Sequence, residues 1–387
     1  RMEATLDDYV YWRLDLDMQH FPYQEVDYLV LAALAYLPLD GLVDRGTEMI
    51  SLERVAQLYQ ERGRVMASSL DSQGAELLRL AGPSKRYGKL RLCFYRNDTD
   101  SELIKQFAAV TFVLEDESLV LAYRGTDDTL LGWHEDFQML LYREVPSQAS
   151  ALQYLEEVLN TMPPVSLSSC LANPLLGMHR YARLKAYASM RQGRPVRLCG
   201  HSKGGNLAMY AAIYAADHQK QIVQVYSYDG PGFQEDILKE SAYQTMLGRI
   251  RSYVPHYAFF GIVLGHEEPY EVVHSFARGM NQHSLYSWEV SPFGFASDEL
   301  SDESVAFAIK VYAFLENLEL AEKEAFIEAL FKLFDDLGLK TFSELSRLSF
   351  KHYLAALKEI SQLSPAVRKN LVQALQIMWD ESKKAKA

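Results

Sequence analysis

One six-residue stretch constrains the fold of this chain more than any other feature. Residues 200–205 read Gly-His-Ser-Lys-Gly-Gly, and they separate the apolar run Val196–Cys199 from segment 206–216, which is rich in small apolar residues. A serine at the point of a strand-to-helix turn adopts a strained backbone, so its neighbours two before and two after must lack bulk. Glycine occupies both of these positions around Ser202. The sequence therefore predicts a nucleophile elbow.

The elbow implies electrostatics as well as packing. A helix that begins directly after Ser202 directs its N-terminal N–H groups at the serine, where they would stabilise negative charge on a bound carbonyl oxygen. The alternative is a glycine-rich turn around an ordinary serine. The strand-like residues before the turn and the helix-like residues after it favour the elbow.

The composition indicates a globular protein with a large core. Of the 387 residues 49% are hydrophobic, and this length suggests one large domain with appended elements. The net charge of -12 argues against nucleic acid as the main partner, because phosphate binding needs a concentrated basic face. The three cysteines are widely spaced and the N-terminus is acidic, which suggests a cytoplasmic protein. The longest apolar stretch, 28–39, is too short to span a bilayer, so no transmembrane segment is expected.

The hydrophobic patterning divides the chain into three stretches. Residues 1–89 predict helices that pack on the core, whereas residues 90–296 alternate strands with helices, as in an α/β fold with a mainly parallel sheet. Residues 297–387 predict further helices beside that core. Strands are expected at 90–95, 107–114, 119–123, 196–199, 222–228, 250–254 and 271–276, the second and third of them forming a hairpin.

A nucleophilic serine needs a base, and three histidines follow the elbow at a suitable distance along the chain. His266 and His274 flank or enter the last predicted strand, whereas His283 lies on a loop beyond its end. The carboxyl edge of a parallel sheet is where catalytic groups gather, so we expect His283 to be the general base. The alternative for His283 is a surface histidine that bonds nearby backbone. His201 is expected to pack behind Ser202, pointing away from the site.

Several motifs occur in an order that resembles a known group. They are Ala122–Thr126 with Gly132–Asp136, the elbow, Tyr226–Phe233, Val254–Pro255, and His266–Tyr270 with His283–Tyr286. Between residues 90 and 290 the chain thus resembles the class 3 (fungal-type) lipases of the α/β-hydrolase superfamily. It resembles more closely an uncharacterised bacterial family related to them. The resemblance implies an α/β-hydrolase fold.

The resemblance also implies roles for individual residues. Thr126 would lie in the oxyanion hole, and the residue after the nucleophile, Lys203, would give a second backbone N–H to it. The alternative for Thr126 is a hydroxyl that satisfies the turn after a strand. Trp133 and Asp136 would hold this loop in place, and His266 would be a structural histidine.

The chain departs from the lipase pattern at the acid of the triad. The lipases carry an aspartate directly before the Val-Pro pair, but here Tyr253 precedes Val254. In related lipases an acid after the neighbouring strand can also reach the histidine, so the resemblance implies Asp229 as the substitute, although an aspartate before Gly-Pro-Gly is also common in turns. Glu267 and Glu268 are weaker candidates. Lys203 stands where the lipases usually have leucine, and we expect its cation to point into solvent rather than to select anionic substrates.

Apolar residues crowd the expected mouth of the site. Leu130 and Leu131 follow the oxyanion segment, and Phe259 and Phe260 precede His266, so these four are predicted to bind the acyl chain. The alternative is that many such residues belong to the ordinary core. Segment 162–177 has little periodicity and is interpreted as a lid or a surface loop.

The sequence thus predicts a serine hydrolase that cleaves acyl esters through an acyl-enzyme on Ser202. Its partners would be an acyl ester or lipid and, transiently, a lipid surface. Two alternatives stay open: a non-catalytic ligand- or partner-binding protein of the same fold, and a thioesterase or acyltransferase. No metal-binding or phosphate-loop motif occurs, so no cofactor or metal is expected.

Overall fold

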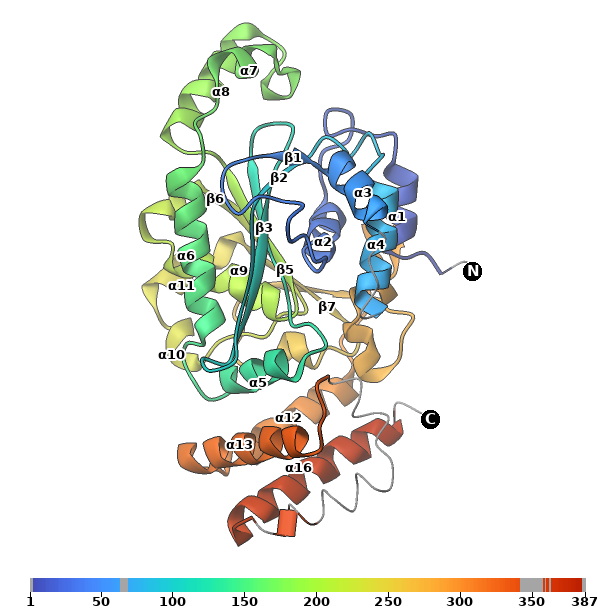
Figure 1. Cartoon of the computed structure of the whole chain (residues 1–387), viewed down its shortest axis with the longest axis vertical. Coiled ribbons are helices and arrows are strands. Elements are labelled where there is room, and N and C mark those ends of the chain that lie inside the picture. The colour runs from blue at the N-terminus through green and yellow to red at the C-terminus, as the bar shows by residue number, and fades with distance from the viewer. Residues whose placement is uncertain (1–2, 63–68, 342–357, 359, 362, 385–387) are drawn as a thin grey trace.

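The computed structural model describes residues 3–62, 69–341, 358, 360–361 and 363–384. Figure 1 shows an elongated molecule with a central sheet between two layers of helices, a helical projection at one end and a group of helices at the other. The predicted elbow around Ser202 lies where the sheet meets this group of helices.

An eight-stranded sheet forms the centre, in the spatial order β1 to β8. Strands β1 to β4 pair antiparallel, whereas β4 to β8 run parallel. Their bounds are Ile50–Ser51, Arg91–Asp100, Lys105–Val113, Leu119–Tyr123, Val196–His201, Ile222–Tyr228, Ile250–Pro255 and Tyr270–Val273. The expected hairpin is confirmed, because β3 and β4 pair antiparallel. A separate pair, β9 and β10, comprises Val290–Ser291 and Gly294–Phe295.

The central strands are buried on both faces. Every residue of β4 is buried, and so is all of β3 after Lys105, which explains their nearly continuous apolar sequences. A parallel sheet that is apolar on both faces must be covered by helices on both sides. The chain therefore has the α/β-hydrolase fold that the sequence predicted, with an antiparallel edge added to the parallel strands.

The first helical layer comes from the N-terminal residues. Its helices are α1 (Leu6–Arg13), α2 (Glu25–Leu34), α3 (Leu52–Glu61) and α4 (Ser69–Ala81). Helix α2 is buried from Val26 to Leu34 and contacts β5, so it lies deep in the core. Asp27 on α2 forms an ion pair of 2.6 Å with Arg86, and both side chains are fully buried.

The second layer covers the opposite face of the sheet. It contains α6 (Pro146–Thr161), α9 (Lys203–Tyr214) and α11 (Ser241–Met246), and α9 contacts β4, β5 and β6. The short helix α10 (Glu235–Leu238) precedes α11. Helix α9 is the helix of the elbow, and it is buried from Lys203 to Ile213. Its small residues allow this close approach to the sheet.

The C-terminal helices form an apolar cluster of their own at the end of the sheet where the parallel strands terminate. They are α12 (Asp302–Glu316), α13 (Leu320–Asp336) and α16 (Pro365–Lys384). Their core packs against Leu130, Trp133 and Phe137 of α5 (Leu130–Met139), the helix that follows the predicted oxyanion segment. These helices therefore lie beside the predicted site (Figure 1).

The segment interpreted as a lid lies elsewhere. Residues 162–177 contain helix α7 (Leu167–Ala172) and a short 3-10 turn, and they lead into α8 (Arg180–Gln192). Helix α8 ends just before the start of β5, whereas Ser202 follows the end of β5, so this segment lies at the opposite edge of the sheet (Figure 1). The lid interpretation is wrong, because the segment lies at the edge of the sheet where the parallel strands begin, whereas Ser202 lies at the edge where they end. Among the described helices, none combines the length and hydrophobicity that a membrane crossing requires.

Candidate active site

The elbow has the strained geometry that its sequence predicted. Ser202 joins β5 to α9 with φ 58° and ψ -132°. A Cβ atom on Gly200 would lie 2.1 Å from the carbonyl group of Gly204, and one on Gly204 would lie 2.1 Å from the Tyr123 carbonyl oxygen. Any side chain at either position would therefore push the strand and the helix apart.

Ser202, His283 and Asp229 form a continuous hydrogen-bonded chain. The Ser202 Oγ lies 2.9 Å from Nε2 of His283, and Nδ1 of His283 lies 2.5 Å from Oδ2 of Asp229. His283 ends a 3-10 turn, Gly279–His283, beyond the last strand of the sheet. The His283 side chain is 18% exposed and that of Asp229 is 1% exposed. The base therefore reaches solvent while its acid partner is enclosed.

Asp229 is held in place from both sides. It follows β6 with φ 53°, its backbone N–H donates to the Tyr253 carbonyl, and its Oδ1 accepts from the Gly261 N–H at 2.8 Å. The parallel strands β6 and β7 end at the same edge, with Tyr228 paired to Tyr253. An acid after β6 can therefore reach the same histidine as an acid on β7.

The other candidate acids and histidines have partners away from Ser202. Glu268 accepts from Tyr243 and Ser252 and pairs with Nδ1 of His266 at 2.6 Å. Burial opposes the charge of Glu268, but these partners outweigh it and lower the pKa of the carboxyl to about 2. Glu267 accepts from Gln244, and His274 pairs with Asp298.

His201 acts as a support for the loop of His283. One of its nitrogens, Nε2, lies 2.8 Å from the His283 carbonyl oxygen, and Nδ1 lies 2.9 Å from the Tyr36 hydroxyl. Burial lowers the pKa of His201 well below its usual value, and the nearby His283 adds to this effect. A carbonyl only accepts, so the neutral ring carries its proton on Nε2 and accepts from Tyr36. Tyr36 is 165 residues away, and the sequence analysis missed it.

The predicted oxyanion segment packs directly against the elbow. A Cβ atom on Gly125 would lie 3.1 Å from the Ser202 Cβ, so the backbone approaches the serine closely. Thr126 Oγ1 donates to Oδ2 of Asp136 at 2.5 Å, which fixes the loop to α5. Burial raises the pKa of Asp136 to about 6, against the opposing effects of Lys203 and Thr126. The backbone N–H of Lys203 is the first of α9, and such groups have no acceptor inside their helix.

The side chain of Lys203 does not point into solvent. It is 1% exposed, its Nζ lies 3.0 Å from Oε2 of the fully buried Glu135, and it donates to the Gln106 carbonyl at 2.9 Å. The solvent interpretation is therefore wrong. Glu135 also accepts from Gln106 N and from both the N–H and hydroxyl of Ser147, so this buried carboxylate provides a prepared partner for the ammonium group.

The four residues predicted to bind an acyl chain are half-buried at two sides of the site. The Phe260 ring lies 4.1 Å from the His283 ring, between centroids, and 5.8 Å from that of Trp133. The Phe259 ring packs at a tilt against that of Phe307 on α12, with 5.0 Å between centroids. Leu130 packs against the C-terminal cluster, and Leu131 follows it on α5. C-terminal helices therefore contribute to the surroundings of these apolar residues.

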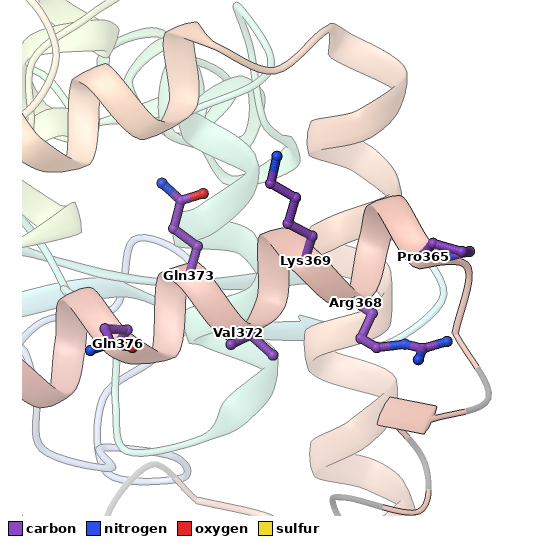
Figure 2. A pocket seen from close by; sticks show the side chains of 6 residues that line it. All are labelled: Pro365, Arg368, Lys369, Val372, Gln373 and Gln376. Carbon is purple, nitrogen blue, oxygen red and sulfur yellow. The ribbon is translucent and has the colours of Figure 1, made fainter.

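A pocket on the outer surface of α16 is separate from this site. Figure 2 shows its lining, which comes from α16 alone and includes no residue near Ser202. In the part of the chain that the structure describes, no three histidine, cysteine or carboxylate side chains are arranged to hold a metal ion.

Comparison with known proteins identifies one family. A family model described as Mbeg1-like matches residues 81–332. No curated protein sequence matches the chain. Solved structures similar to it include a Rhizomucor miehei lipase propeptide complex, with 13% identity over 64% of this chain and 67% of the other and a TM-score of 0.34. A lipase from Rhizopus microsporus var. chinensis has 12% identity over 73% and 81%, with a TM-score of 0.36. With scores this low, the fold assignment rests on the sheet order and the elbow.

Proposed function

The chain belongs to the Mbeg1-like family, and for this member we propose the activity of a serine hydrolase that cleaves acyl esters. The single observation that carries the proposal is the chain of contacts from the Ser202 hydroxyl through His283 to the enclosed carboxylate of Asp229. The same fold could serve as a ligand-binding scaffold, but such a scaffold has no need of a strained serine bonded to a histidine and an aspartate.

In the proposed reaction, Ser202 Oγ attacks the ester carbonyl carbon as Nε2 of His283 takes the hydroxyl proton. Asp229 keeps the other ring proton on Nδ1 and stabilises the imidazolium that forms. His283 then gives its proton to the departing alkoxide, which leaves an acyl group on Ser202. Water, deprotonated by His283, releases the acid and restores the serine.

The proposed oxyanion hole consists of the backbone N–H groups of Thr126 and Lys203. Support comes from the close approach of the Gly125 backbone to Ser202 and from the position of Lys203 at the start of α9. Side-chain contacts hold both residues: Thr126 bonds Asp136, and Lys203 pairs with Glu135. Since Glu135 and Asp136 are neighbours on α5, one helix would position both donors.

The proposed substrates carry an apolar acyl group. Phe260 lies against the His283 ring, and the apolar rings of Trp133 and Phe259 lie next to Phe260. An acyl chain bound against these rings would lose its contact with water, which favours binding by about 25 cal/mol per Å² of apolar surface. Leu130 and Leu131 are proposed to border the same region.

Hydrolysis of p-nitrophenyl esters of graded chain length tests the proposal. We expect the wild type to hydrolyse these esters, and we expect Ser202→Ala and His283→Ala to show no turnover. Circular dichroism should show that both variants are folded. The exposed Ser168 provides the matched control, because Ser168→Ala removes a hydroxyl far from the elbow. Equal rates for wild type and Ser202→Ala on every ester would contradict the proposal.

We also propose that the protein works in the cytoplasm. Cys93, Cys170 and Cys199 are free and buried, and burial raises the pKa of the Cys93 thiol to about 12. Such thiols pack as small hydrophobic groups, as is common in a reducing compartment. Fractionation of cells that express the natural protein tests this location.

A further inference from the structure

One stretch of the chain differs sharply in charge from the rest. The protein has 51 acidic and 39 basic residues, yet residues 162–194 contain no aspartate or glutamate. The basic residues in this stretch are Arg180, Arg183, Lys185, Arg191 and Arg194. A positive segment in a protein of net charge -12 marks a surface with its own electrostatic preference.

This stretch forms a projection. Residues 162–192, which we call the α7–α8 projection, extend from one end of the molecule (Figure 1). Helix α8 contains no buried residue, and its packing is mainly against α7 and the 3-10 turn Pro174–Leu176. Most of the α8 surface therefore remains open to solvent.

The open surface of the α7–α8 projection carries large apolar side chains. Met178 is 83% exposed, Tyr181 79% and Leu184 44%. Tyr181 and Leu184 are three residues apart on α8 and so lie on one side of the helix, and Met178 lies just before the N-cap residue His179. A surface helix normally turns its large apolar side chains toward the protein, so the exposure of Tyr181 and Leu184 leaves apolar surface of α8 open to a partner.

Basic side chains flank the apolar face. Arg180, Lys185 and Arg191 are exposed, and within the described chain none of them forms an ion pair. The other two arginines are structural: Arg183 donates to the Gly177 and Leu171 carbonyls, and Arg194 to the Pro163 carbonyl. Three cations are therefore available to a partner.

The acidic residues at the base of the projection have partners of their own. Glu117 pairs with Arg91 at 2.9 Å and lies 3.7 Å from Arg194. Asp116 accepts from the Ser118 hydroxyl at 2.6 Å. These carboxylates lie on the turn between β3 and β4 rather than on α8, so they leave the positive side of the helix exposed.

We infer that the α7–α8 projection docks on the surface of an anionic phospholipid bilayer. Exposed tyrosine, methionine and leucine side chains would enter the boundary between headgroups and acyl chains, while Arg180, Lys185 and Arg191 contact the phosphates and carboxylates. Charge complementarity selects this occupant, because the projection carries exposed cations and no aspartate or glutamate. The rest of the acidic protein would be repelled by the same membrane, so the projection is the part that would contact it.

This docking is independent of the proposed hydrolysis. The projection precedes the start of β5, and Ser202 follows the end of the same strand, so the two lie at opposite edges of the sheet. A protein held by the α7–α8 projection would keep Ser202 on the side of the sheet that faces away from the bilayer. Docking would thus localise the protein and leave the site free.

Sedimentation of the full-length protein with vesicles tests the inference. We expect binding to vesicles of phosphatidylcholine mixed with phosphatidylserine, weak binding to phosphatidylcholine alone, and weaker binding as salt is raised. Replacing Arg180, Lys185 and Arg191 by glutamine should weaken binding on the order of a hundredfold, since each surface cation contributes about fivefold. Met178→Ser with Tyr181→Ser should also weaken it.

The matched control removes three exposed cations elsewhere: Lys220→Gln, Arg251→Gln and Lys310→Gln. The inference predicts that this control and Ser202→Ala bind vesicles like the wild type. Equal losses in the control and in the α8 triple variant would overturn it, as would a wild type that binds neither vesicle. If the Met178 and Tyr181 variant changes the oligomeric state by light scattering but not vesicle binding, the surface pairs two copies and the inference is wrong.

Discussion

The buried pair of Lys203 and Glu135 allows the sharpest quantitative prediction. Lys203→Met keeps most of the volume of the side chain but leaves the Glu135 carboxylate without the cation that lies 3.0 Å away. Both side chains are almost completely enclosed, so solvent cannot replace the lost partner. Removal of one member of a buried pair costs about 3–5 kcal/mol of the free energy of unfolding.

The expected change in melting temperature follows from the size of the chain. Unfolding entropy is about 2.1 cal/mol/K per residue, so for a chain of this length a loss of about 3–5 kcal/mol lowers the midpoint by about 4–6 °C. Glu135→Gln in the Lys203→Met background removes the uncompensated charge. We expect this double variant to recover part of the lost stability, because replacing both partners costs less than breaking the pair.

Thermal and urea unfolding followed by circular dichroism measure both effects. Lys220→Met is the matched control, because Lys220 is exposed and its loss should change stability by less than about 0.5 kcal/mol. The reasoning fails if Lys203→Met is no less stable than this control. It also fails if the losses of unfolding free energy from Lys203→Met and from Glu135→Gln simply add in the double variant. A Lys203→Met variant that remains folded should also hydrolyse esters more slowly, because it keeps the backbone N–H proposed as an oxyanion donor but loses the side-chain contacts to Glu135 and Gln106 that position it.

Three further predictions concern the surroundings of Ser202. Asp229→Asn should lower kcat for ester hydrolysis by about ten-thousand-fold with little loss of folded protein, because the amide cannot hold the required tautomer of His283; steady-state kinetics that show less than a tenfold loss would contradict this role. Tyr36→Phe removes the buried hydroxyl that bonds His201 at 2.9 Å, and urea unfolding should show a loss of about 1–2 kcal/mol, whereas no loss would contradict the bond. Asp136→Asn should stabilise the fold more at pH 7.5 than at pH 5. Burial raises the pKa of Asp136 in the folded state from 3.8 to about 6, so between these two values the folded wild type holds a proton that the unfolded chain has lost. The wild type therefore loses stability as the pH rises from 3.8 through 6, and the asparagine variant does not. A difference in unfolding free energy between the variant and the wild type that does not change with pH would refute this.

The parts of the fold that the sequence predicted are those encoded locally. The elbow depends on glycines within two residues of Ser202, and β3 to β5 are short apolar runs bounded by turns, whereas the two-residue β1 and the polar second half of β2 were not predicted. Asp229 was implied by the resemblance to the lipases, and its place next to His283 is possible because the neighbouring parallel strands β6 and β7 end at one edge. Such features need no knowledge of distant contacts.

The features that the sequence analysis missed depend on long-range packing. The solvent-exposed position predicted for Lys203 is wrong because its partner, Glu135, lies 68 residues earlier in the chain. No sequence motif links the two residues. The support of His201 by Tyr36 spans 165 residues. Residues 162–177 look like a lid only when their place at the amino edge of the sheet is unknown.

The most direct test of the central claim is covalent labelling of the folded protein with a fluorophosphonate, followed by mass spectrometry of its peptides. A serine activated by His283 and Asp229 should react, so the account predicts one adduct on Ser202, its loss in His283→Ala, and unchanged labelling in Ser168→Ala. A folded wild type that acquires no adduct on Ser202, or that is labelled equally well without His283, would contradict the account.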